Sequence, residues 1–205
     1  MGTVPVVRRG PRYVRRGVAA AVVAVLATMD AVAAAEFTLA SAAFADDAML
    51  PVKYAGAQCR SGLAGGNVSP PFAWTNPPPQ TRSFALIFAD ADGRRGLGSV
   101  HWVAYGIPAT RTELKEGAGA APSGDAVVQG TDSRIVQGKN TRGTLGYSGP
   151  CGGAAADAAH HYMIELIALD LEPGALQGGL DREQLMRAID GHALQPTSLV
   201  VRYKP

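Results

Sequence analysis

Apolar and polar side chains alternate most clearly between Phe84 and Tyr105, where two apolar runs flank a short connection rich in glycine and arginine. Side chains of a β-strand point alternately to its two faces, so this pattern predicts two neighbouring strands. The first run ends at Asp90 and Asp92, which we expect to share one face. The second begins with His101, which we expect to share a face with Tyr105. Two carboxylates and an imidazole at one end of neighbouring strands predict a polar cluster at the rim of a sheet.

The same alternation recurs twice further along the chain. The segment 160–170 predicts a third strong strand, with His160 and Tyr162 on one face, and the segment 197–203 predicts a last strand. We expect shorter extended segments before them. These are 37–39, 50–54 and the proline-rich 69–74, which we place along a sheet edge because proline removes a backbone donor.

One helix is indicated, over residues 181–190. Asp181 can cap its first turn, Gln184 stands at the capping-box position, and Gly191 follows its last turn. Apolar residues recur at three- and four-residue spacing along it, which predicts a stripe that faces the core. The stripe consists of Leu185, Met186 and Ile189.

Strands therefore outnumber helices, and residues 109–159 contain no long periodic segment. A parallel sheet would need crossover helices between its strands, and the pattern does not supply them. The sequence predicts an all-β or β-rich fold, namely an antiparallel β-sandwich with long loops and one helix near the C-terminus.

The first 35 residues differ in character from the rest. Five arginines precede a twelve-residue apolar run, 18–29, and the small residues 31–35 follow it. A basic start, a short apolar region and a small-residue site are typical of a secretory signal peptide. Twelve apolar residues are too few to cross a bilayer, which takes about 20. We expect residues 1–35 to be a signal peptide, residues 36–205 to form a single exported domain, periplasmic or secreted, and no stable membrane insertion after cleavage.

The overall charge of +2 belongs to that leader. Five of the 19 basic residues and one of the 17 acidic residues lie within it, which leaves 14 basic and 16 acidic residues in the mature chain. A nucleic-acid-binding surface must neutralise phosphates, so this balance excludes a nucleic-acid partner.

The mature chain holds two cysteines, Cys59 and Cys151. An even count in an exported protein permits a disulfide, which would close a loop of about 90 residues and add roughly 4 kcal/mol on the chain-entropy model. Two separate free thiols are the alternative. The spacing is not that of a zinc site.

Four polar features can carry chemistry: the Asp90/Asp92 pair, His101, the loop at Gly149–Cys151, and the segment His160–Tyr162. Each has an ordinary explanation by itself, because aspartates often begin turns and buried histidines often only hydrogen-bond. Their placement near one end of three strands favours a joint role.

These features, taken in order, resemble the phosphatidylethanolamine-binding protein family in its bacterial Raf-kinase-inhibitor-like branch. The resemblance covers about Phe37 to Tyr203. Its pieces are Phe37-Thr38-Leu39, Phe44-Ala45-Asp46, Asn67-Val68-Ser69-Pro70 with Trp74, Asp90-Ala91-Asp92, His101-Trp102, Gly138-Lys139-Asn140, Gly146 to Cys151, His160-His161-Tyr162, Ala168-Leu169-Asp170 and Gly191 to Leu194.

The resemblance implies an antiparallel β-sandwich with a small anion pocket at one end that accepts phosphate-like groups, including phospholipid head groups. The residues that match the family's pocket are Asp90 with Asp92 beside it, His101, Gly149, Pro150, His160 and Tyr162. Imidazoles and a phenol can donate hydrogen bonds to phosphate oxygens, while a carboxylate can orient a histidine or meet an ammonium group. Histidine titrates near neutral pH, so we expect binding to weaken as pH rises above the histidine pKa.

The chain departs from the family pattern at two loops. Ala91 and the segment 93–96 stand where the family has prolines, and Gly152-Gly153 follows Cys151 in place of two prolines. Arg94 and Arg95 are either extra positive charge at the pocket rim or solvated turn residues.

We expect an exported, non-enzymatic binding protein for a small anionic or phosphorylated ligand, with no cofactor and no metal. A hydrolase using His101, His160 and Asp90 is one alternative, but no nucleophile motif accompanies them. A metal site of two histidines and a carboxylate is another. A protease inhibitor or a scaffold for an envelope protein is a third. The sequence leaves the oligomeric state open.

Overall fold

The computed structural model describes residues 1–2, 35–57, 59, 65–121, 135–151 and 158–204. The predicted signal peptide therefore lies almost wholly outside the described residues. One compact unit spans Ala35–Pro205, and the fold below is that of this unit.

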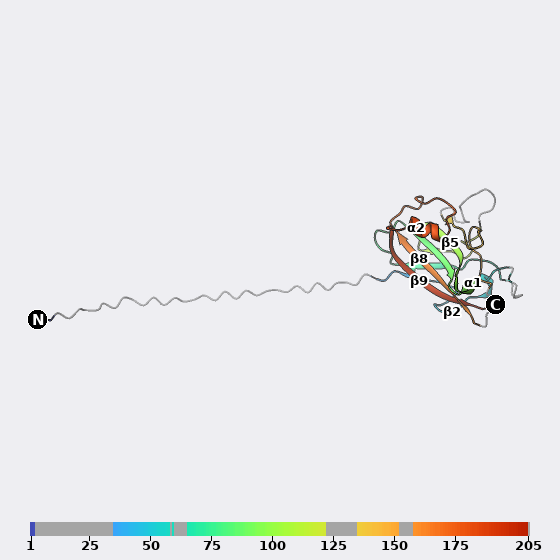
Figure 1. Ribbon diagram of the computed structural model, residues 1–205, viewed down its shortest axis with the longest axis horizontal. Helices are drawn as coiled ribbons and strands as arrows, with labels where there is room; N and C mark the ends of the chain where they lie inside the picture. Colours follow the sequence, from blue (N-terminus) through green and yellow to red (C-terminus); the bar gives the residue numbers. More distant parts are fainter. Residues whose placement is uncertain (3–34, 58, 60–64, 122–134, 152–157, 205) are drawn as a thin grey trace. The chain divides into compact units, whose positions relative to one another are not determined.

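A six-stranded sheet carries the three strong strands of the sequence pattern. Its long central strands lie side by side in Figure 1, and each pairs antiparallel with its neighbours. The strands β2 and β9, at one edge of the sheet, pair in parallel, whereas the sequence predicted an antiparallel fold. The order is β2 (Ala48–Met49), β9 (Ala193–Tyr203), β8 (His160–Leu169), β4 (Ser83–Asp90), β5 (Ser99–Pro108) and β7 (Val136–Gln137).

A smaller sheet of three short strands contains β1 (Thr38–Ala40), β3 (Phe72–Thr75) and β6 (Glu113–Leu114) in the order β1-β3-β6. The central place of β3 corrects the prediction that residues 69–74 follow a sheet edge. The strand begins only at Phe72, after Pro70 and Pro71, so its own residues keep the donors that two neighbours require.

The helices are short. Val52–Tyr54 forms a 3-10 turn, η1, where a strand was predicted, because the N–H groups of Tyr54 and Ala55 donate to the carbonyl oxygens three residues before them. The helix α2 (Arg182–Ala188) has the predicted capping box: Asp181 accepts from the backbone N–H of Gln184, and the Gln184 side chain accepts from the N–H of Asp181.

Only two of the three residues of the predicted α2 stripe reach the core. Leu185 and Ile189 are buried one turn apart, whereas Met186 is 40% exposed. A helix of seven residues presents a single narrow row to the sheet, and Met186 lies beside that row.

Aromatic contacts join the two sheets. The ring centroids of Trp74 in β3 and Phe84 in β4 are 5.1 Å apart, and those of Phe72 and Trp102 are 6.5 Å apart. A second apolar cluster lies on the other face of the large sheet and includes Leu185 of α2. The prediction of a β-rich fold is therefore confirmed, and within the described residues no helix is long and apolar enough to cross a membrane.

Candidate functional site

Asp90, the last residue of β4, organises the polar cluster. Its side chain is only 6% exposed. The Oδ2 atom accepts a hydrogen bond from Nδ1 of His160 at 2.9 Å, and Oδ1 accepts one from the backbone N–H of Asp92 at 2.9 Å. The register of β4 with β8 places Asp90 opposite Tyr162, whose hydroxyl hydrogen-bonds to the same carboxylate. Asp90 thus orients two neighbours and is not itself open to solvent.

Tyr162 stands between the two histidines of the site. Its ring centroid lies 5.3 Å from that of His101 and 6.4 Å from that of His160. Burial raises the pKa of the Tyr162 hydroxyl far above its usual value, and the negative charge of Asp90 raises it further. The phenol therefore keeps its proton at physiological pH. We call Asp90, His101, His160 and Tyr162 the histidine site.

A β-bulge places His101 in this site. The pairing of β4 with β5 shifts between Phe88–Trp102 and Ala89–Val100, so His101 is the extra residue on β5. A bulge re-aims a side chain, and His101 contacts Phe88 and Tyr162 on the inner face. Strict alternation predicts that His101 and Tyr105 share one face of the sheet. That prediction was wrong, because Tyr105 belongs to the second apolar cluster, on the opposite face.

The imidazole of His101 is held by the neighbouring loop. Its Nδ1 contacts the carbonyl oxygen of Ser148, while the Ser148 N–H donates to the His101 carbonyl oxygen at 2.8 Å. Burial lowers the pKa of His101, although the hydrogen bond to Ser148 and the charge of Asp90 act in the opposite direction. His101 is therefore neutral at pH 7.

The two histidines share one geometry. Nδ1 of His101 faces a carbonyl oxygen and Nδ1 of His160 faces a carboxylate oxygen. Both partners can only accept, so Nδ1 carries the proton in each ring. Within the described residues neither Nε2 has a hydrogen-bond partner, so each can accept a hydrogen bond when its ring is neutral and donate one when it is protonated.

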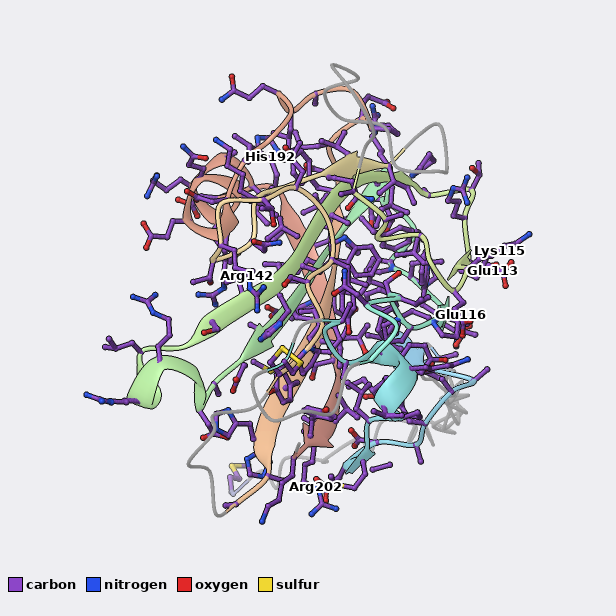
Figure 2. The ribbon with its side chains drawn as sticks, turned by 90° about the vertical axis from the view of Figure 1, so that its right-hand side faces the viewer. Glu113, Lys115, Glu116, Arg142, His192 and Arg202 are labelled. Atoms are coloured by element: carbon purple, nitrogen blue, oxygen red, sulfur yellow. A yellow bond between two sulfur atoms is a disulfide. The ribbon has the colours of Figure 1, made fainter. Side chains whose placement is uncertain are left out.

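The Gly149–Cys151 loop is tied down at three consecutive residues. The N–H of Gly149 donates to Oδ1 of Asn67 at 2.8 Å, and the carbonyl oxygen of Pro150 accepts from the N–H of Gly56 at 2.8 Å. Cys151 forms a disulfide with Cys59, visible as a yellow bond in Figure 2, so the predicted pairing is present. These ties hold Ser148, the partner of His101, in place. Gly152 and Gly153 lie outside the described residues.

Asp92 does not join the histidine site. Because β4 ends at Asp90, strand alternation does not extend to Asp92, which pairs with His161 instead. Its Oδ2 accepts from the His161 N–H at 2.8 Å and lies 3.0 Å from Nδ1, and these bonds lower the pKa of Asp92. The pair lies at the surface, where the Asp92 side chain is 47% exposed.

Sequence reasoning missed three residues that support the site. Asn67 holds the Gly149 backbone and itself has a positive φ of 51°. Asn140 is buried and accepts from the N–H groups of Arg142 and Thr144, which shapes the loop beside His101. The charge of Arg142, labelled in Figure 2, contributes to the lowered pKa of His101. Asn67 and Asn140 occur in the family-like segments, but only the folded chain shows what they contact.

The connection between β4 and β5 has an unusual backbone. The element α1 (Gly93–Gly96) contains Arg94 and Arg95 at φ values of 52° and 63°, in the left-handed region that non-glycine residues rarely adopt. A side chain at Gly93 would displace its neighbours, since a Cβ there would lie 2.7 Å from Oγ of Ser99 and 2.9 Å from Oδ2 of Asp90.

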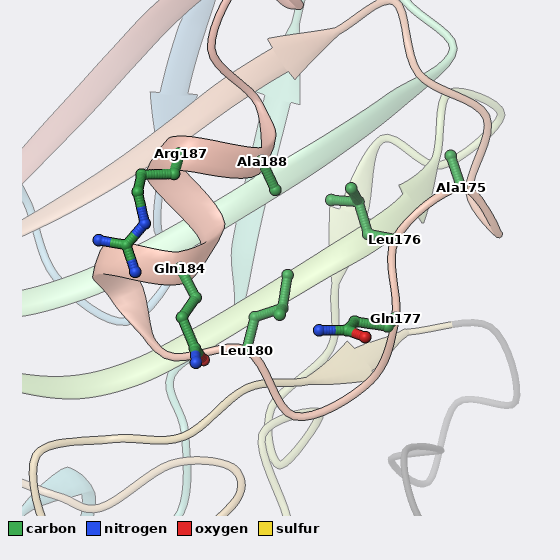
Figure 3. A pocket seen from close by; sticks show the side chains of 7 residues that line it. All are labelled: Ala175, Leu176, Gln177, Leu180, Gln184, Arg187 and Ala188. Atoms are coloured by element: carbon green, nitrogen blue, oxygen red, sulfur yellow. The ribbon is translucent and has the colours of Figure 1, made fainter.

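In the described part of the chain, no group of three or more His, Cys, Asp or Glu side chains is arranged to hold a metal ion. One surface hollow of about 550 Å³ lies between α2 and the segment 175–180 (Figure 3). Among the described residues that line it, Arg187 is the only charged one, and none of them belongs to the four polar features found in the sequence.

The comparisons with known proteins agree on one family. The profile described as phosphatidylethanolamine-binding protein matches residues 40–204. The UPF0098 protein of Methanothermobacter thermautotrophicus is 36% identical over 169 residues, which cover 79% of this chain and 95% of that protein. The UPF0098 protein of Pyrococcus horikoshii is 32% identical, over 80% of this chain and 75% of its own.

Two solved structures resemble this one. The crystal structure of Escherichia coli YbcL, described as a new member of the mammalian PEBP family, has a TM-score of 0.70 and 28% identity, and the match covers 83% of this chain and 99% of YbcL. A putative phosphatidylethanolamine-binding protein homologue of Chlamydia trachomatis has a TM-score of 0.66 and 30% identity, over 82% and 97% of the two chains. The chain belongs to the phosphatidylethanolamine-binding protein family.

Proposed function

We propose that this protein is a non-enzymatic binding protein whose histidine site takes a small phosphorylated anion, such as the head group of a phospholipid. One observation carries the proposal. Two imidazoles flank Tyr162, and each has its Nδ1–H committed to a protein acceptor, which leaves each Nε2 for a ligand. None of its four members is a serine, threonine or cysteine, the side chains that a neighbouring histidine most often activates as nucleophiles, which favours binding over hydrolysis.

Proton uptake should accompany binding. Neutral His101 presents a lone pair at Nε2, which repels an anion, so a phosphate oxygen binds there only after the ring gains a proton. The pKa of His101 is lowered in the free protein, so the ligand must supply the free energy of protonation. Affinity should therefore decrease as pH rises above the pKa of free His101, which lies below the usual histidine value, by up to about tenfold per pH unit for one proton taken up.

The test is calorimetric titration with phosphoethanolamine between pH 7 and 9, a range in which the phosphate ester, with a second pKa of about 6, is already a dianion. The variants His101→Asn and His160→Asn keep a donor at the Nδ1 position but remove Nε2. We expect each to weaken binding at least tenfold while its Tm stays near that of the wild type. A flat pH profile, or full affinity in both variants, would contradict the proposal.

We also propose export, with residues 1–35 removed and residues 36–205 forming the mature domain. The disulfide between Cys59 and Cys151 supports it, since such bonds persist in oxidising compartments. The expected product is a chain that starts at Glu36 and has no reactive thiol, outside the cytoplasm. Mass spectrometry of fractionated cells measures both properties, and an intact, reduced chain in the cytoplasm would refute export.

The fold proposed for this mature domain is the family's antiparallel β-sandwich, with α2 as its helix near the C-terminus. The aromatic contacts between the two sheets support that arrangement. In this architecture the histidine site would open at one end of the large sheet, beside the loop tied by Cys59 and Cys151.

A further inference from the structure

The carboxylate of Asp90 is occupied by donors of the protein itself. Its Oδ2 accepts from Nδ1 of His160 and its Oδ1 from the N–H of Asp92, both at 2.9 Å. The Tyr162 hydroxyl adds a third hydrogen bond. A carboxylate has about four lone-pair sites, so little of its capacity to accept remains. The side chain is also only 6% exposed, so Asp90 acts through its partners and does not present its negative charge to a ligand.

Another side of the same carboxylate faces the backbone of the β4–β5 connection. A Cβ on Gly93 would come within 2.9 Å of Oδ2 of Asp90 and within 2.7 Å of Oγ of Ser99, so the space beside Oδ2 is too narrow for a methyl group. An ammonium group is as large as a methyl group. It therefore cannot reach Asp90 from this side unless the turn moves.

The second carboxylate of the Asp90/Asp92 pair is engaged at the surface. Oδ2 of Asp92 accepts from the backbone N–H of His161 at 2.8 Å and lies 3.0 Å from Nδ1 of the same residue. The Asp92 side chain is 47% exposed, so water screens any contact that an ammonium group makes with it. Neither aspartate therefore offers the desolvated negative charge that would hold an ammonium group strongly.

The imidazoles of the site favour an anion and disfavour a second cation. His101 and His160 each commit Nδ1 to a protein acceptor, so Nε2 is the atom that meets a ligand. Nε2 must carry a proton to donate to a phosphate oxygen, and the imidazolium ring then repels a cation beside it. The positive charge of Arg142 also acts on His101. In phosphoethanolamine only two carbon atoms separate the ester oxygen from the ammonium group, so that group stays close to the same rings.

We propose that the histidine site recognises the phosphate group alone, so that its ligands are phosphate esters of small alcohols and the ammonium group of ethanolamine adds nothing to affinity. This inference rests on the proposed function and specifies its ligand class. Phosphate oxygens accept the hydrogen bonds that protonated imidazoles donate, whereas an ammonium group can only donate and meets other donors there. An ester with an uncharged alcohol should therefore bind at least as tightly as phosphoethanolamine.

The experiment compares phosphoethanolamine with propyl phosphate, which carries a methyl group in place of the ammonium group, by calorimetric titration of the full chain. At about pH 7.5 both phosphates are mostly dianions, and the amine is charged, as a lysine side chain is. We expect the Kd of propyl phosphate to equal that of phosphoethanolamine or to lie below it, and ethanolamine alone not to bind. A charge-assisted hydrogen bond from the ammonium group to a buried carboxylate would instead favour phosphoethanolamine by about tenfold or more.

Two variants show which part of the ligand is recognised. H160N removes a donor to phosphate and should weaken both esters by the same factor, whereas D92N should leave the ratio of the two Kd values unchanged. A preference for phosphoethanolamine above about twofold in the wild type, or a ratio that D92N changes by more than that, would overturn this inference and leave the binding function intact. Binding of neither ester would overturn the proposed function, and this inference with it.

Discussion

Asp90 and Asp92 are the same residue type two positions apart, yet they have different surroundings. Asp90 is buried and accepts from His160, Tyr162 and the Asp92 backbone. Asp92 pairs with His161 in contact with solvent, which screens the interaction. The first carboxylate therefore holds the histidine site together, while the second stabilises the turn that follows β4.

Replacing the two aspartates separately tests this difference. Asp90→Ala leaves a histidine N–H, a tyrosine hydroxyl and a backbone N–H without their acceptor, so we expect a loss of about 2–4 kcal/mol in the free energy of unfolding. Asp92→Ala serves as the matched control and should cost less than about 1 kcal/mol. Urea denaturation measures both values, and equal losses would show that burial does not separate the two roles.

At the scale of elements, the strands β4, β5 and β8 and the capped helix α2 could be predicted because each depends on local alternation or on residues within one helical turn. The position of His101 could not, because a bulge depends on how β4 and β5 pair, which the periodicity of either strand does not contain. The support from Asn67 and the position of Asp92 likewise depend on contacts across the fold.

The loop that carries Gly149 offers a prediction at the same scale. A Cβ on Gly149 would lie 2.5 Å from the carbonyl oxygen of Tyr54, so Gly149→Ala must displace the loop that positions Ser148 against His101. We expect a loss of about 1–3 kcal/mol in stability and weaker phosphoethanolamine binding. Gly174→Ala, where a Cβ meets no atom within 4 Å, should change neither quantity. Thermal unfolding and calorimetry provide the two measurements, and a wild-type result for Gly149→Ala would contradict the close contact.

At the scale of the whole molecule, the disulfide joins two segments that are 92 residues apart, and one of them is the loop that places Ser148 against His101. Replacing Cys59 and Cys151 with alanine should lower the free energy of unfolding by about 2–5 kcal/mol. Phosphoethanolamine affinity should fall as well, because the Gly149–Cys151 loop loses one of its ties. Unchanged stability in the double variant would show that the backbone ties suffice.

The strand β9 lies between β2 and β8, although it is the last strand of the chain. Near one end, the N–H of Asp47 donates to the carbonyl oxygen of Val200, and the N–H of Val200 donates to Oδ1 of Asp46. The strand β2 can therefore find its partner only after the chain has been synthesised as far as β9, so this part of the large sheet forms late. Until β9 has been made, β8 keeps one unpaired edge, so β9 joins β2 to the rest of the large sheet in a single late step.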